Sequence, residues 1–460
     1  MFTFTPEMAE LAEAINAFAH DRIAERTGTL SAPPPAPELE AAIRATITAG
    51  GLGAKSAFRC FTDQIAPHCQ AVDHERFLAF VAHPPAVAAS LFDMAVSAAG
   101  IFGTSWLEAA GATVAENEAL RWLANVLGMP ETAGGTFLSG ATIANLNALA
   151  AARAAWRAAH PDHDRRLAVA MTFEAHSSAK MVARCLDFEI VPVAMDARGR
   201  LTGEHLATAL DAATHDACAV VATAGITNVG IVDDLASVAD VCAERDVWFH
   251  VDAAYGGAAI IVPEKRDLFA GIERADSVVI DPHKWLFAPL DCSALLYRNP
   301  AQARAAFTQH ADYIAAFQSV GDWNPGDFAM HLTRRTRGLP FWFMLATYGT
   351  DAVVEAVRSS IDLANATARA IEARRGLHLL MEPELSVVVF TVDGWNMAQY
   401  SVFCDRLLTE GTAFILPTVV DHAPCLRFCF VNPRTTIADV NLILDEIAAE
   451  QANADVGRAG

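Results

Sequence analysis

The sequence lacks an excess of basic residues and lacks long apolar runs. Its 460 residues carry 54 acidic and 33 basic side chains, for a formal net charge of −21. Nucleic acids and anionic membranes bind basic faces, so this balance argues against both as partners. No uninterrupted apolar run reaches membrane-spanning length, and residues 1–7 lack the basic and apolar regions of a signal peptide. We therefore expect a cytoplasmic protein.

The sequence also lacks paired cysteine motifs. Its nine cysteines are odd in number, and no two of them have CxxC spacing. Cys425 and Cys429 could suggest a metal site, but no matching histidine or cysteine pair follows them. We expect reduced, packed cysteines in a reducing compartment and no metal site.

Charged residues are few, at 19% of the chain, whereas apolar residues make up 53%. This composition excludes a disordered protein, and the length suits two or three domains. Apolar positions at helical spacing over residues 7–26, a proline-rich break at 32–37 and a second helix at 38–48 predict an N-terminal helical segment. We find no internal repeat.

Strands and helices alternate from residue 167 onward. Apolar runs predict strands at 167–171, 188–193, 217–222, 247–251, 277–280 and 293–297, with helices at 177–186, 202–212 and 234–245. This alternation is typical of a mostly parallel sheet that is covered by helices. A long helix at 349–374, followed by short strands and helices, predicts a small α+β domain.

Two ionisable residues follow apolar runs at the predicted strand ends. Asp252 lies in the block HVDAAYGG, and Lys284 lies in DPHKWL. Ligands of α/β proteins bind at the carboxyl ends of parallel strands. Pyridoxal 5'-phosphate requires a lysine that forms a Schiff base and an aspartate that keeps the pyridine nitrogen protonated. The two blocks therefore predict a site for this cofactor.

A third block predicts where an anion binds. The stretch GGTFLSGAT at 134–142 leads into a long helix rich in alanine and leucine. Small and hydroxyl residues at a helix start expose backbone N–H groups under a favourable dipole. An ordinary helix cap looks the same, so this block indicates phosphate binding only together with the other two.

Together these blocks resemble the group II pyridoxal-phosphate-dependent amino-acid decarboxylases, such as aromatic-L-amino-acid and glutamate decarboxylases. The resemblance covers residues 77–436 and rests on SGATIAN, EAHSSAK, ITNVG with Asp233, HVDAAYGG, DPHKWL, Arg334-Arg335 and Leu426-Arg427 in family order. It implies an α/β fold of type I, with a mostly parallel seven-stranded sheet. It also implies a homodimer with shared active sites, in which the helical segment at 1–75 packs on the other subunit; a mobile N-terminal arm is the alternative. The predicted domains are a large one at 76–346 and a small C-terminal α+β domain at 347–460.

The resemblance assigns roles residue by residue. Lys284 would be the Schiff-base lysine, Asp252 the partner of the pyridine nitrogen and His176 the histidine that stacks on the cofactor ring. In isolation, His176 would more often be a helix cap or a core residue. The remaining cofactor contacts would be made by Gly140, Ala141, Thr142 and His283 at the phosphate, Ala254 beneath the ring, and Thr223 at its phenolic edge or at the stacked histidine.

Five residues are predicted to contact the substrate: Phe80, His83, Phe102, Thr104 and Trp323. Phe102 and Thr104 would face the site of the neighbouring subunit, and the aromatic residues favour an aromatic or bulky apolar substrate over glutamate. His83 could bind the substrate carboxylate or sense an acidic side chain, and a surface histidine is equally consistent. Arg427 could clamp a carboxylate or serve structure.

One departure from the family bears on the reaction. Family members carry a mobile loop whose tyrosine is thought to protonate Cα, whereas residues 320–326 contain no tyrosine and Tyr313 lies too early. In the family, loss of this tyrosine is associated with oxidative decarboxylation and deamination to an aldehyde. An amino-acid decarboxylase that yields CO₂ and an amine is the favoured interpretation, and an aldehyde synthase is the alternative.

Two further functions are weighed. A non-catalytic cofactor-binding protein is disfavoured because it has no need of Lys284, Asp252 and His176 together. An aminotransferase is disfavoured because DPHKWL resembles the decarboxylases.

Overall fold

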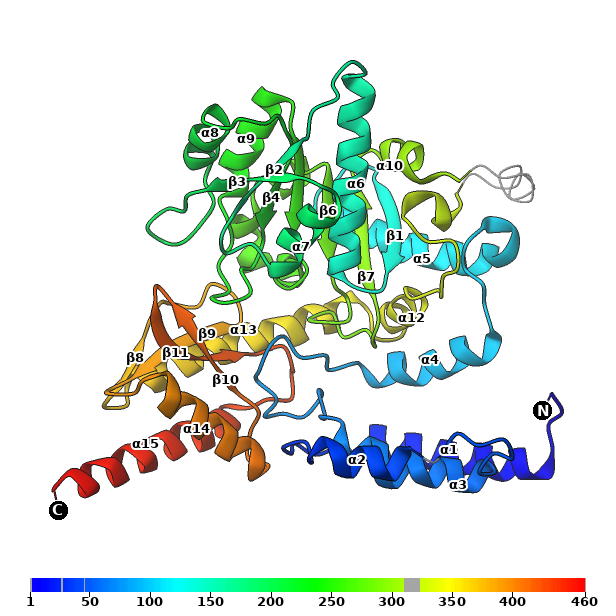
Figure 1. Cartoon of the computed structure of the whole chain (residues 1–460), viewed down its shortest axis with the longest axis vertical. Coiled ribbons are helices and arrows are strands. Elements are labelled where there is room, and N and C mark those ends of the chain that lie inside the picture. Colours follow the sequence, from blue (N-terminus) through cyan, green and yellow to red (C-terminus); the bar gives the residue numbers. More distant parts are fainter. Residues whose placement is uncertain (1, 26–27, 45, 310–322, 460) are drawn as a thin grey trace. The chain divides into compact units, whose positions relative to one another are not determined.

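The computed structural model describes residues 2–25, 28–44, 46–309 and 323–459 (Figure 1). Residues 313 and 320–322, which entered the argument about the missing tyrosine, lie outside the described residues. The chain forms two compact units. One comprises Met1–Ala82, Arg369–Leu380 and Val389–Gly460, and the other comprises His83–Ala368 and Met381–Val388. The division at residues 75 and 346 stays a prediction.

The larger unit is built on a seven-stranded sheet in the order β1-β7-β6-β5-β4-β2-β3. β7 is antiparallel to both of its neighbours, and the pairs among β2 to β6 are parallel. β1 therefore runs in the same direction as β6. The predicted α/β fold with a mostly parallel sheet is confirmed. The strands are β1 (Gly134–Leu138), β2 (Ala168–Thr172), β3 (Glu189–Val193), β4 (Ala217–Thr223), β5 (Trp248–Asp252), β6 (Ser277–Ile280) and β7 (Ser293–Tyr297).

Helices cover this sheet because its strands are apolar on both faces. Every residue of β1, β2, β5, β6 and β7 is buried, as expected for strands with helices on both sides. α6 (Ala141–Ala159) packs across β4 to β7. The other helices of this unit are α4 (Val87–Ala99), α5 (Trp106–Val126), α7 (Ser177–Cys185), α8 (Gly203–Asp211), α9 (Leu235–Arg245), α10 (Pro300–Phe307) and α12 (Leu339–Tyr348), with most of α13 (Thr350–Glu372).

The smaller unit combines the N-terminal helices with a four-stranded sheet in the order β10-β11-β9-β8. Its helices are α1 (Pro6–Ala24), α2 (Ala36–Ile43), α3 (Ala54–Cys60), α14 (Met397–Thr409) and α15 (Ile437–Ala459). The strands are β8 (Leu377–Leu379), β9 (Val387–Val392), β10 (Leu416–Val420) and β11 (Ala423–Cys429). α1 contacts α3 through Phe18, whose ring meets those of Phe58 and Phe61 edge-on. Within the described ranges, no helix is long and apolar enough to cross a membrane.

Candidate active site

The residues predicted to bind the cofactor gather at one edge of the larger sheet. The carboxyl ends of parallel strands meet there, so Thr223 at the end of β4 and Asp252 at the end of β5 share this edge. α6 begins there because it follows β1 directly. Lys284 lies in loop 281–292, which joins β6 to β7. Since these two strands are antiparallel, the loop begins and ends at the same edge.

Lys284 is paired with a buried carboxylate. Its Nζ lies 2.8 Å from Oδ2 of Asp281, whose side chain is 2% exposed. Burial raises the pKa of Asp281, but the charges of Lys284 and His283 outweigh burial and lower that pKa below its ordinary value. Asp281 therefore remains ionised as a counter-ion that orients the lysine amine.

His83 lies beside His283, with ring centroids 5.1 Å apart. Nδ1 of His83 is 3.2 Å from the backbone oxygen of His283, and because a carbonyl can only accept, Nδ1 carries the proton. Burial, followed by the nearby charge of His283, lowers the pKa of His83 to about 4. The ring is therefore neutral at pH 7, and its Nε2 is an acceptor that suits a donor group better than a carboxylate.

Asp252 is held by two N–H donors. Its Oδ2 accepts from Nδ2 of Asn145 at 2.9 Å, and its Oδ1 accepts from the backbone N–H of Ala254 at 3.1 Å. Both donors suit an ionised carboxylate. With both oxygens fixed and the side chain buried at the strand end, Asp252 fits the partner of a protonated ring nitrogen.

The start of α6 fits a phosphate group. Gly140 is its N-cap, and no side chain among the described residues caps the helix there. A Cβ built on Gly140 would meet no atom within 4 Å, so there is open space on the side of Gly140 that a Cβ would occupy. The first N–H groups of the helix, on Ala141 and Thr142, lie at the positive end of the helix dipole. An uncapped helix start beside open space is a site that a phosphate can occupy.

His176 is the N-cap of α7. Its Nδ1 accepts from the backbone N–H of Ser178 at 3.2 Å and lies 2.8 Å from the Ser178 hydroxyl. Helix capping is one of the two roles that the sequence suggests for His176 taken in isolation. It also fixes the orientation of an exposed ring. Stacking on the cofactor stays a prediction.

Thr223 is tied to Asp233 through the backbone. Oδ2 of Asp233 accepts from the N–H of Thr223 and Oδ1 accepts from the N–H of Leu201, both at 2.7 Å. Burial raises the pKa of Asp233 to about 7, even though both N–H donors lower it. The aspartate that follows ITNVG therefore fixes the end of β4. Ala254 is buried two residues beyond Asp252.

The predicted substrate residues differ in how they are held. Thr104 is buried, and its hydroxyl donates to the carbonyl of Leu332. Trp323 stacks on Phe328, with centroids 4.1 Å apart. It also lies beside Gly134, which starts β1, whereas Gly140 follows the other end of that strand. Phe102 stays 42% exposed. The substrate roles of these residues stay predictions.

Phe80 belongs to the smaller unit, where it is 59% exposed and its φ is 53°. A phenylalanine rarely adopts this left-handed conformation. Nη1 of the buried Arg427 donates to the Phe80 carbonyl at 2.6 Å and so supports this backbone. Of the two roles considered for Arg427, the structural one is therefore present.

Sequence reasoning missed two polar residues that the structure brings to the site. Asn145 contacts Asp252, which lies 107 positions later in the chain, and Asp281 contacts Lys284, which lies three positions later. The signal for Asn145 was an amide among the apolar residues of the first half of α6, and for Asp281 a carboxylate inside the lysine block. In the part of the chain that the structure describes, no three histidine, cysteine or acidic side chains are grouped to hold a metal.

Comparison with known proteins matches this chain to decarboxylases. The family described as the pyridoxal-dependent decarboxylase conserved domain matches residues 54–393. The chain is 31% identical over 397 residues to an aromatic-L-amino-acid decarboxylase of Bacillus atrophaeus, covering 82% of this chain and 81% of that protein. It is 32% identical over 395 residues to an L-2,4-diaminobutyrate decarboxylase of Rhizobium meliloti (strain 1021), covering 83% and 78%.

A solved structure extends the likeness to the whole fold. The crystal structure of Oryza sativa TDC with PLP and tryptamine superposes with a TM-score of 0.90 at 26% sequence identity. The match covers 97% of this chain and 100% of that chain.

Proposed function

Because this chain belongs to the family of pyridoxal-dependent decarboxylases, we propose that it converts an aromatic or bulky apolar L-amino acid to the amine and CO₂. The protein is a pyridoxal-phosphate-dependent carboxy-lyase of fold type I that acts on an amino acid. The observation that carries the proposal is the meeting of Lys284, Asp252 and the open start of α6 at one sheet edge.

Each site residue has a proposed task. Bound pyridoxal phosphate supplies a ring that accepts electrons from the bond being broken. Lys284 would hold the cofactor through its amine, and Asp252 would hold a proton at the ring nitrogen. The remaining residues would position the cofactor: Gly140, Ala141, Thr142 and His283 at the phosphate, and His176, Ala254 and Thr223 around the ring.

The proposed substrate class rests on the exposed aromatic residues and on the relatives. Phe80 and Phe102 keep large apolar surfaces exposed. Several relatives are named for aromatic substrates, including the Bacillus atrophaeus enzyme and a tryptophan decarboxylase of Oryza sativa subsp. japonica. The relative named for 2,4-diaminobutyrate makes a cationic side chain the main competing class.

We also infer a homodimer with shared active sites in the cytoplasm. Helices α1, α2 and α3 contain no buried residue among those described, although α1 carries apolar residues at helical spacing. A second subunit could cover them. The nine cysteines form no disulfide bond, and six of them are buried, which fits a reducing compartment.

An aldehyde synthase is the second candidate, favoured by the lack of tyrosine at residues 320–326. That reaction consumes one O₂ and one water for each amino acid. It releases one aldehyde, one CO₂, one ammonia and one hydrogen peroxide. A decarboxylase consumes no O₂ and retains the nitrogen in the amine.

The two reactions are separated by incubating the holoenzyme in air with a panel of L-amino acids. The panel contains tryptophan, tyrosine, phenylalanine, histidine, glutamate and 2,4-diaminobutyrate, and CO₂, amine, aldehyde, ammonia and peroxide are each quantified. We expect equimolar amine and CO₂ from an aromatic member, without peroxide. Equimolar aldehyde and peroxide would establish the synthase instead. A protein without products or absorbance changes would be a binding protein only.

A further inference from the structure

A chain of four hydrogen bonds runs through the larger sheet to Asp252. Nε1 of Trp248 donates to Oγ of Ser277 at 2.8 Å, and this Oγ lies 2.8 Å from Nδ1 of His250. Nε2 of His250 lies 2.9 Å from Oδ1 of Asn145, and Nδ2 of Asn145 donates to Oδ2 of Asp252 at 2.9 Å. All five side chains are buried.

The backbone makes this chain possible. Trp248, His250 and Asp252 are every second residue of β5, so their side chains lie on the same face of the strand. Ser277 on β6 is the register partner of His250. α6 packs against these strands and carries Asn145 four residues after its first residue, Ala141. The helix whose start is the proposed phosphate site therefore also supplies the donor to Asp252.

The direction of every bond follows from the two ends of the chain. An indole N–H can only donate, and an ionised carboxylate can only accept. Asn145 must therefore offer its NH₂ group to Asp252, which turns its oxygen toward His250. Nε2 of a neutral His250 must then carry the proton, and Nδ1 must accept the hydroxyl proton of Ser277. Each donor points toward Asp252, and each link polarises the next.

We propose that Asn145 and His250, backed by Ser277 and Trp248, are positioning residues that hold Asp252 as an oriented acceptor for the ring nitrogen of pyridoxal phosphate. The proposal rests on the role given to Asp252 in the proposed function. Full burial lowers the pKa of His250 to about 4, which keeps the ring in the neutral form that this direction needs. A protonated His250 would still donate from Nε2 but would lose its acceptor at Nδ1.

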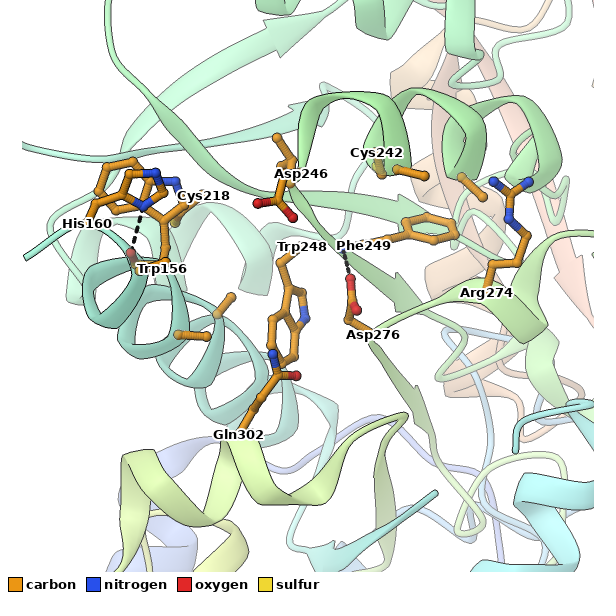
Figure 2. A pocket seen from close by; sticks show the side chains of 16 residues that line it. Trp156, His160, Cys218, Cys242, Asp246, Trp248, Phe249, Arg274, Asp276 and Gln302 are labelled. Carbon is orange, nitrogen blue, oxygen red and sulfur yellow. Dashed lines mark hydrogen bonds between the residues drawn. The ribbon is translucent and has the colours of Figure 1, made fainter. Parts of the chain in front are cut away.

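The far end of this hydrogen-bond chain lies at a cavity near the amino end of β5, at the opposite end of the strand from Asp252. Trp248 lines this cavity of about 390 Å³ together with Cys218, Phe249 and Asp276 (Figure 2). Figure 2 shows the Trp248 side chain beside Asp276, whose Oδ2 accepts from the N–H of Phe249 at 2.7 Å. Trp248 is therefore the last member, and its replacement tests the chain without touching the cofactor edge.

The structure offers a matched control on the same helix. Asn147 is also buried on α6, but its amide serves other groups. Its Nδ2 donates to the carbonyl of Ile143 at 2.7 Å, and its Oδ1 accepts from the N–H of Met330 at 2.5 Å. Replacing Asn147 with leucine therefore buries the same apolar side chain in place of a hydrogen-bonded amide, without changing the contacts of Asp252.

The test measures the dissociation constant of pyridoxal phosphate for the apo-protein by absorbance titration. Asn145→Leu should weaken binding by roughly tenfold or more, because a hydrogen bond to a charged group is lost. His250→Phe should weaken it less and Trp248→Phe least, while Asn147→Leu should stay within about twofold of wild type. Thermal unfolding of each apo-protein reports any loss of fold separately.

A double-mutant cycle with Asp252→Asn separates positioning from general packing. If Asn145 acts through Asp252, Asn145→Leu should change affinity by less than about twofold in the Asp252→Asn background. Equal losses in both backgrounds would overturn the proposal, as would equal losses for Asn145→Leu and Asn147→Leu.

The cycle also distinguishes the two levels of inference. If Asp252→Asn weakens binding but Asn145→Leu does not, the positioning chain is wrong and the role of Asp252 stands. If Asp252→Asn binds the cofactor as tightly as wild type does, the role proposed for Asp252 is wrong, and the hydrogen bonds from Asn145 and His250 have no cofactor contact to support.

Discussion

At the scale of single residues, the proposed chemistry depends most directly on Lys284. Lys284→Ala should lower kcat by at least about 10²–10⁴-fold, the range contributed by one positioned catalytic group. It should also abolish the visible absorbance of the lysine-bound cofactor. Lys265, whose Nζ donates to the carbonyl of Glu384 outside the cofactor edge, provides the control. Absorbance that persists in Lys284→Ala but disappears in Lys265→Ala would contradict the assignment.

The sequence predicted some site residues and not others for a physical reason. Lys284 and Asp252 each follow an apolar run, and a strand end is a local feature that spacing alone can locate. Asn145 reaches Asp252 only when α6 packs on β5, across 107 positions of the chain. Which polar side chain of a helix faces the sheet is decided by that packing, so a single sequence offered no partner for it.

At the scale of elements, the proposed phosphate site at the start of α6 can be tested with two glycines, Gly140 at the helix start and Gly135 in the preceding strand β1. A Cβ on Gly140 meets nothing within 4 Å, and its φ of 173° is extended backbone that any residue adopts. Gly140→Ala should therefore change apo-protein stability by less than about 0.5 kcal/mol. It should weaken pyridoxal phosphate binding on the order of tenfold if the phosphate occupies this space.

Gly135 in β1 gives the opposite result by the same reasoning. Its Cβ would lie 1.8 Å from the backbone oxygen of Leu295 on the paired strand β7. Gly135→Ala should unfold the protein or lower its melting temperature sharply. An apo-protein that tolerates Gly135→Ala but not Gly140→Ala would show that these glycines have other roles.

Two adjacent arginines allow a second test of how elements are joined. Arg334 forms a buried pair with Glu116 on α5, with Nη1 2.8 Å from Oε2, and it also donates to the carbonyl of Gly103. Arg334→Met leaves Glu116 buried without its charge partner and should cost about 3–5 kcal/mol. The pair of Arg335 with Asp93 is partly exposed, so Arg335→Met should cost about 0–1 kcal/mol. Urea unfolding of the apo-proteins measures both, and equal costs would refute this difference.

Element boundaries were predictable where apolar runs are short and bounded. β6 and β7 have the predicted bounds, and β5 is displaced by one residue. β1 was not predicted as a strand, because its first two residues, Gly134 and Gly135, lack the β-branched or aromatic side chains that are typical of strands. Its glycine at position 135 is instead required by the close approach of β7. Nor could the spacing reveal that β7 runs antiparallel.

At the scale of the whole molecule, buried histidines should make stability depend on pH. Burial lowers the pKa of His83, His250 and His331 to about 4. Unfolded histidines titrate near 6.5, so the unfolded chain binds more protons between these values and stability falls as pH falls. From pH 7 to pH 5, each histidine should cost roughly 2 kcal/mol.

Asp233 opposes this trend, because its pKa is raised to about 7. The folded chain binds more protons there, so lowering the pH from 7 to 5 restores roughly 2 kcal/mol. The three histidines outweigh it, and the melting temperature of the apo-protein should drop by several degrees over this range. Replacing His331 with glutamine should reduce the drop, whereas a melting temperature that rises toward pH 5 would contradict these pKa values.

The antiparallel direction of β7 has a consequence for how much length variation the lysine segment can accept. Loop 281–292 leaves the sheet at Ile280 and returns to it at Ser293, so both of its anchors lie on adjacent strands. A backbone N–H of this loop, that of Cys292, donates to Nδ1 of His283 at 3.1 Å and ties its second anchor to its first turn. Because the loop is fixed at both ends, it could accommodate an inserted residue only by changing its path, and this would displace the lysine amine. We expect natural homologues to keep the number of residues between these two strands nearly constant.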